Sequence, residues 1–78
     1  MNNNLNLQIQ KLVNFFNAGN YNKVLELSKN LIKKNPNFDF VFNIAGLCYQ
    51  KLNDFENAEV FFIRSIDINK KNVNALTN

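Results

Sequence analysis

The chain has 78 residues, with nine Lys or Arg, six Asp or Glu, one Cys and no His. This length allows one small domain, and a hydrophobic content of 46% is typical of a folded protein. The composition excludes a disulfide framework and a zinc site with the usual ligands, and the single thiol fits a reducing compartment. The 18 Asn residues are the most unusual feature, because Asn disfavours helix interiors.

Two helices are predicted in the first half of the chain. Residues 5–17 place one apolar face at helical spacing: Leu5, Ile9, Leu12, Val13 and Phe16. Residues 21–34 place another: Val24, Leu25, Ser28, Leu31 and Ile32. Gly19 suits a left-handed cap between these helices. Pro36 ends the second helix, because proline disfavours helical geometry in the residue before it.

Two more helices are predicted in the second half. Residues 39–52 are apolar around most of the circumference, which indicates a central, buried helix. Residues 55–69 are expected to bury a further stripe: Phe55, Ala58, Phe62, Ser65 and Ile66. Asp39 and Asp54 are predicted to cap the starts of these two helices. The fold class is therefore all-α, and many of the Asn residues fall in the turns.

A repeat with a period of about 34 residues relates the two helix pairs. Residues 18–21 align with residues 52–55, and Phe15 aligns with Tyr49. Residues 39–72 carry a spaced series of aromatic and small residues: Phe42, Ala45, Gly46, Tyr49, Ala58, Phe62, Ser65 and Lys70. This series resembles the tetratricopeptide repeat, in which two helices cross closely at small residues.

The resemblance implies one domain, residues 1–78, with helix-turn-helix repeats stacked as a short right-handed solenoid. Residues 5–38 resemble a degenerate repeat, with Leu12 at the Gly place and Val24 at the Ala place. Residues 39–72 are the well-matched repeat, and residues 73–78 resemble the start of a truncated third. Since repeat arrays end in polar caps, an uncapped C-terminal end favours either a fragment of a longer array or an end that a partner covers.

The resemblance also implies a concave groove that binds an extended peptide or a partner protein. The positions that match its lining are Asn6, Ile9, Val13, Phe16, Asn17, Phe40, Asn43, Leu47, Gln50 and Lys51. The expected function is a protein–protein interaction scaffold. The alternative is the N-terminal repeat segment of a larger bacterial enzyme, for example a transferase, and a basic nucleic-acid binder is a third, weaker hypothesis.

An apolar patch is expected on the fourth helix. Val60 and Ile63 occupy places where the family normally has charged residues, and with Phe61 they would form an exposed apolar patch. Exposed apolar patches often mark association. We therefore expect self-association, or docking of a further part of a longer protein, through this patch or the open C-terminal end.

No catalytic arrangement is predicted, so the chain is expected not to be an enzyme and to need no cofactor or metal. Glu56 and Glu59 share a helix face but are interpreted as acids of the first turns that face solvent. Cys48 has no His to activate it and is predicted to be a buried small hydrophobe. Glu26 is expected to pair with Lys29, and Asp67 with the cations at positions 64, 70 and 71.

The partner and compartment are predicted from charge and hydropathy. The net charge of +3 is spread along the chain, and the doublets at 33–34 and 70–71 are interpreted as cations of last helical turns. This pattern favours a protein partner and not nucleic acid. The sequence offers no signal peptide and no membrane span, so a cytoplasmic protein is expected.

Overall fold

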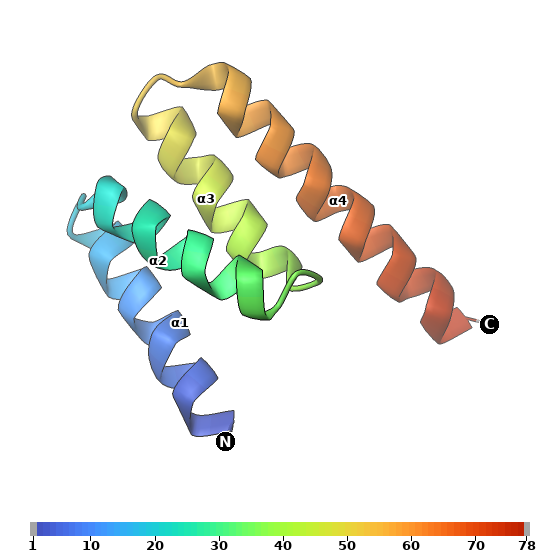
Figure 1. The fold of residues 1–78 in the computed structure, drawn as a ribbon. Coiled ribbons are helices and arrows are strands. Elements are labelled where there is room, and N and C mark those ends of the chain that lie inside the picture. The colour runs from blue at the N-terminus through green and yellow to red at the C-terminus, as the bar shows by residue number, and fades with distance from the viewer. Residues whose placement is uncertain (1, 78) are drawn as a thin grey trace.

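The computed structural model describes the backbone of residues 2–77 and the side chains of residues 5–72. Its helices are α1 (Asn2–Asn17), α2 (Tyr21–Lys34), α3 (Asp39–Lys51) and α4 (Phe55–Thr77). They run alternately in opposite directions, so that the start of α1 and the end of α4 lie at the same end of the molecule (Figure 1). No strand occurs in residues 2–77, and the all-α prediction is confirmed.

The helix boundaries agree with the prediction except at the two outer ends. α1 begins at Asn2, and α4 continues through 70–72 to Thr77. No Pro or Gly follows residue 69, and Lys is a good helix former, so nothing stops α4 where a break is predicted. The doublet at 70–71 therefore does not lie in a last turn, whereas Lys33 and Lys34 do. The side chains of the predicted third repeat, residues 73–78, lie outside the described residues.

Asp39 and Asp54 are predicted to cap the starts of α3 and α4, and only Asp54 does so. The backbone N–H of Asn57 donates to Asp54 Oδ1 at 3.3 Å, so Asp54 does cap α4. The cap position of α3 is held by Phe38, whose side chain makes no capping bond. The prediction for Asp39 is therefore wrong by one position, because Asp39 is already the first helical residue.

The hydrophobic core lies around α3, as its apolar circumference predicts. Its buried members come from three helices: Leu12, Val24, Leu25, Leu31, Val41, Ile44, Ala45 and Cys48. α3 packs most extensively against α4 and then against α2, whereas α1 contacts α2 less. The core is thus continuous from α1 to α3, and α4 covers the far side of α3.

α4 buries a narrower stripe than the sequence suggests. Ala58, Ser65 and Ile68 are buried, but Phe55 and Ile66, which were expected in the core, are 62% and 55% exposed. In the described residues, α4 has a neighbour on the α3 side only. A helix with a single neighbour buries a smaller arc than one packed on both sides.

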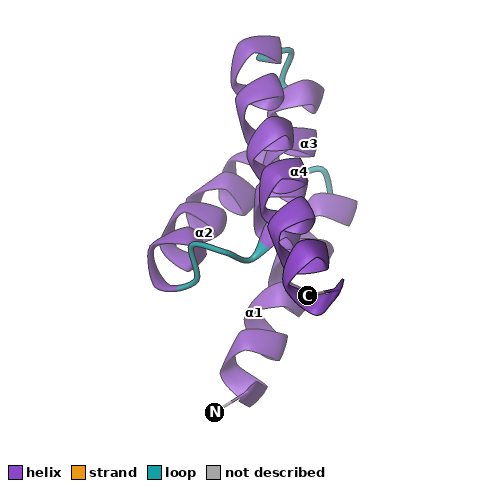
Figure 2. Ribbon diagram, turned by 90° about the vertical axis from the view of Figure 1, so that its right-hand side faces the viewer, coloured by secondary structure: helices purple, strands orange, loops and turns teal. Residues whose placement is uncertain are grey.

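The molecule is flat and open compared with a globular domain of the same length. Its radius of gyration is 12.8 Å, whereas a compact chain of this length has about 11.5 Å. Its smallest dimension is 19 Å, roughly two helix diameters. α2 projects on one side of the other helices (Figure 2). The helices thus form a row in which each packs mainly on its neighbours in sequence.

The turn between α1 and α2 is a Schellman motif centred on Gly19. Gly19 has a φ of +77°, the left-handed conformation predicted for it. The N–H of Gly19 donates to the carbonyl of Phe16 at 3.0 Å, and the N–H of Asn20 donates to the carbonyl of Phe15 at 2.9 Å. These two bonds satisfy carbonyls at the end of α1 that have no partner within the helix.

The turn between α3 and α4 repeats this geometry one sequence period later. Asn53 has a φ of +64°. Its N–H donates to the carbonyl of Gln50 at 3.0 Å, and the N–H of Asp54 donates to the carbonyl of Tyr49 at 2.8 Å. Each residue of this turn aligns with its counterpart in the first, so the period found in the sequence is a period of the backbone as well.

α3 and α4 cross closely at Gly46. A Cβ added to this glycine would lie 2.7 Å from two carbons of the Phe62 ring. Farther along the crossing, the Ser65 hydroxyl donates to the backbone carbonyl of Asp39 at 3.0 Å. The small residue at position 46 therefore has the packing reason that the sequence suggests.

Candidate functional site

The predicted groove residues form two stripes with the same spacing, one on α1 and one on α3. On each helix the stripe residues are half-buried or exposed. The half-buried members are Ile9, Val13, Phe16, Phe40 and Leu47. The exposed members are Asn6, Asn17, Asn43, Gln50 and Lys51. Each stripe therefore combines apolar surface with side chains that are free to make hydrogen bonds.

Phe16 and Phe40 also contribute to the fold. Both pack against the hydrophobic core. The ring of Phe16 meets that of Tyr21 edge-on, with centroids 5.5 Å apart. The ring of Phe40 lies 6.1 Å from that of Phe38. These two residues therefore connect the stripes to the core, whereas the amides of Asn43 and Gln50 lie at the surface.

The predicted patch on α4 borders a shallow hollow of about 390 Å³. Val60 and Ile63 are 59% and 60% exposed. Phe61 is half-buried, because its ring packs 5.1 Å from Tyr49 and 5.9 Å from Phe42, between ring centroids. Phe61 is thus part of the floor of the hollow, and the exposed apolar edge belongs to Val60 and Ile63.

Three lining residues of this hollow, Phe42, Arg64 and Asp67, are absent from the predicted patch. Arg64 places its guanidinium carbon 5.9 Å from the centroid of the Phe42 ring. A cation over an aromatic face is attracted by the ring quadrupole. The position of Arg64 four residues after Val60 is a signal that could have placed it beside the patch.

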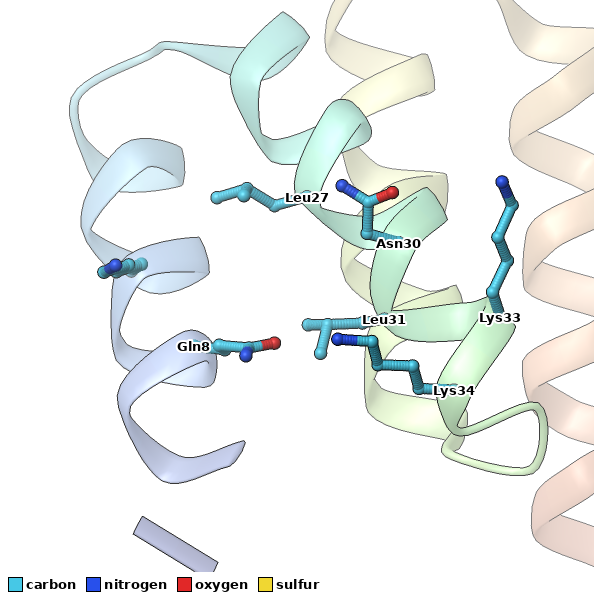
Figure 3. Close-up of a pocket in the computed structure, with 7 residues that line it drawn as sticks. Gln8, Leu27, Asn30, Leu31, Lys33 and Lys34 are labelled. Carbon is cyan, nitrogen blue, oxygen red and sulfur yellow. The ribbon is translucent and has the colours of Figure 1, made fainter. Parts of the chain in front are cut away.

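A second hollow, not predicted from the sequence, lies between α1 and α2. It has a volume of about 370 Å³ and is lined by Gln8, Lys11, Leu27, Asn30, Leu31, Lys33 and Lys34. Leu27 and Leu31 extend from α2 toward α1, and Lys34 points toward Leu31 and Gln8 (Figure 3). We call this hollow the basic cleft, because three of its seven lining residues are lysines and none is acidic.

The only cysteine of the sequence, Cys48, lies in the hydrophobic core. Burial raises the pKa of the Cys48 thiol to about 11, and its side chain is fully buried, as predicted. At neutral pH the thiolate, which is the reactive form, is therefore scarce. The part of the chain that the structure describes holds no group of three His, Cys, Asp or Glu side chains able to bind a metal ion.

The ion pairs are local and exposed. Lys23 Nζ lies 2.8 Å from Glu26 Oε1, so Glu26 pairs with Lys23 and not with Lys29 as expected. The hydrogen bond from Lys23 and its charge lower the pKa of Glu26. Lys71 Nζ lies 3.4 Å from Asp67 Oδ2, one of the contacts predicted for Asp67. Exposed pairs of this kind contribute little to stability.

Comparisons with known proteins found no match to this chain. No protein-family model, curated protein or solved structure gives a significant match. Within the described residues, no helix combines the length and the apolar character that crossing a membrane requires.

Proposed function

We propose that this chain is a cytoplasmic protein–protein interaction module built from two tetratricopeptide-like helix pairs in a short right-handed solenoid. In this proposal, an extended peptide or a segment of a partner protein binds along the stripes on α1 and α3. The module has no catalysis, cofactor or nucleic-acid partner of its own. The repeated turn at Gly19 and Asn53 carries the proposal.

Burial at matching positions supports two equivalent helix pairs. Leu12 and Gly46 are buried at the same place of α1 and α3. One helix later, Val24 and Ala58 also occupy matching places of the repeat and are 0% and 4% exposed. In the second pair these places hold smaller residues, and α3 and α4 make the more extensive contact of the two pairs. Matching positions are thus equally buried although their side chains differ in size. This favours one backbone arrangement that is common to both helix pairs and is packed with different side chains in each.

The composition of the stripes supports a peptide ligand. Asn43, Leu47 and Gln50 recur at spacings of four and three residues, so they share one face of α3. An amide side chain can both donate to and accept from a peptide backbone. Leu47 between them offers apolar surface to a ligand side chain. An extended peptide is the ligand class that uses both features along one line.

Selection from a random peptide library, displayed on phage and panned against the purified chain, tests the proposal. We expect enriched peptides whose affinity falls about tenfold or more in the double variant Asn43→Ala, Gln50→Ala, since each lost hydrogen bond contributes about 1 kcal/mol. The matched control is Asn22→Ala, Asn69→Ala, which removes two exposed amides elsewhere and should leave affinity unchanged. Failure to enrich any peptide, or equal losses in both variants, would contradict the proposal.

A further inference from the structure

The charge is not spread along the chain, as predicted above, but is divided unequally between the two helix pairs. Residues 1–38 contain five Lys and one Glu, a net charge of +4, whereas residues 39–78 contain four cations and five acids, a net charge of −1. The division is sharper at the start of α4. Residues 54–63 contain three acids and no cation. The chain therefore has a basic half and an acidic region on α4.

The basic cleft combines charge with apolar surface. Leu31 is almost fully buried in its floor and Leu27 is half-buried. Lys11 and Lys34 are exposed at its edge, and no acid within the described residues forms an ion pair with either. A ligand complementary to this cleft has an apolar side chain to cover the leucines and carboxylates on either side to pair with the lysines.

α4 presents that combination on its outer face. Glu56, Val60 and Ile63 follow one another at spacings of four and three residues, and Glu59 stands four before Ile63, so all four share one side. All four are exposed. Within the described residues, neither Glu56 nor Glu59 has an ion-pair partner. We call this surface the acidic face.

We propose that the basic cleft of one copy binds the acidic face of a second copy. Ile63 and Val60 then cover Leu27, while Glu56 and Glu59 approach Lys11 and Lys34. The cleft lies between the helices at one end of the row and α4 is the helix at the other end (Figure 1).

The contact therefore joins two different surfaces and repeats head to tail, as a ring or an open chain of copies. The basic cleft has no aromatic lining residue on which a base would stack, so a single-stranded nucleic acid fits it less well. The contact is independent of the peptide groove proposed above, and each proposal is tested by its own variants.

Sedimentation velocity over a range of protein concentrations tests the contact. We expect the wild-type chain to associate at about 0.1 M salt and to dissociate toward a monomer at about 1 M, where the Debye length falls from about 10 Å to about 3 Å. The cleft variant Lys11→Glu, Lys34→Glu and the face variant Glu56→Lys, Glu59→Lys should each raise the dissociation constant about tenfold or more. Mixed in equal amounts, the two variants should associate again, because each supplies the surface that the other has lost.

The control Lys29→Glu, Lys51→Glu changes the net charge by the same amount as the cleft variant, but neither residue lines the cleft. It should associate as the wild type does. Val60→Gln, Ile63→Gln should weaken association without adding charge. Circular dichroism of each variant verifies the fold. Substitutions at exposed positions should preserve it. A wild type that stays monomeric throughout, a control as impaired as the cleft variant, or a mixture that stays monomeric would overturn the proposal.

Discussion

Gly19 and Asn53 occupy matching places of the two helix pairs and hold the same left-handed backbone conformation, with φ of +77° and +64°. Each closes a helix through the same pair of backbone hydrogen bonds. A residue with a Cβ is strained there, and Asn is the one that tolerates it best after Gly. The two turns are therefore alternative solutions to one backbone requirement.

The two turns should respond alike to alanine. We expect Gly19→Ala and Asn53→Ala each to lower the free energy of unfolding by about 1 kcal/mol, because alanine must adopt a positive φ. Gly19→Asn should cost less than Gly19→Ala. Urea titration followed by circular dichroism measures the differences. The control is Asn17→Ala, at the last residue of α1. Its free energy of unfolding should stay within about 0.5 kcal/mol of that of the wild type. An unchanged midpoint for both turn variants would argue against the shared requirement.

The sequence predicts those parts of the fold that local rules govern. Pro36 ends α2, Gly19 takes the left-handed cap and Asp54 caps α4, each through its own backbone geometry. The apolar circumference of residues 39–52 likewise predicts a central helix, which the structure forms over Asp39–Lys51. These features depend on a few neighbouring residues, so they can be read without knowledge of the whole molecule.

Features that depend on a neighbour in space were harder to predict. Phe55 and Ile66 match a helical stripe, yet they are exposed because α3 covers only one side of α4. Lys11 of α1 and Lys34 of α2 both line the basic cleft, and no spacing along the chain relates those two residues. The unequal charge of the two halves was the available signal for the cleft. This signal indicates which half of the chain is basic, but it does not predict that a hollow forms there.

Two buried serines should respond in opposite directions to alanine. Ser28 is 1% exposed and its hydroxyl has no hydrogen-bond partner, whereas the Ser65 hydroxyl donates to the Asp39 carbonyl at 3.0 Å. We expect Ser28→Ala to raise the free energy of unfolding by up to about 1 kcal/mol, since it removes an unsatisfied buried group. Ser65→Ala should lower it by about 1 kcal/mol, because it removes a buried hydrogen bond. Both are measured by urea titration, and changes of the same sign would contradict this assignment.

The buried thiol of Cys48 should make stability depend on pH in the alkaline range. Burial raises its pKa from about 9, the value of an exposed thiol, to about 11. The unfolded chain therefore loses this proton first as pH rises. The thiol's contribution is intact below about pH 9 and is lost toward pH 11, a decrease of about 3 kcal/mol.

Cys48→Ala isolates this effect, because both proteins share every other group that titrates. At pH 7 the variant should be less stable than the wild type by about 1 kcal/mol, owing to the lost side-chain volume. As pH approaches 11 the order should reverse. Urea titrations across this range provide the measurement. A difference in the free energy of unfolding that stays constant at every pH would show that burial does not raise the pKa of Cys48.

The close approach of Gly46 and Phe62 leads to a test of the α3–α4 crossing. Alanine is favoured over glycine within a helix by about 1 kcal/mol. At position 46, however, its Cβ would lie 2.7 Å from the Phe62 ring, and overpacking of this kind costs about 1–3 kcal/mol. Gly46→Ala should therefore destabilise the wild type by about 1 kcal/mol but stabilise the Phe62→Ala background. Such a double-mutant cycle gives a coupling of about 2 kcal/mol, and a stabilising effect of similar size in both backgrounds would mean that the ring does not limit the crossing.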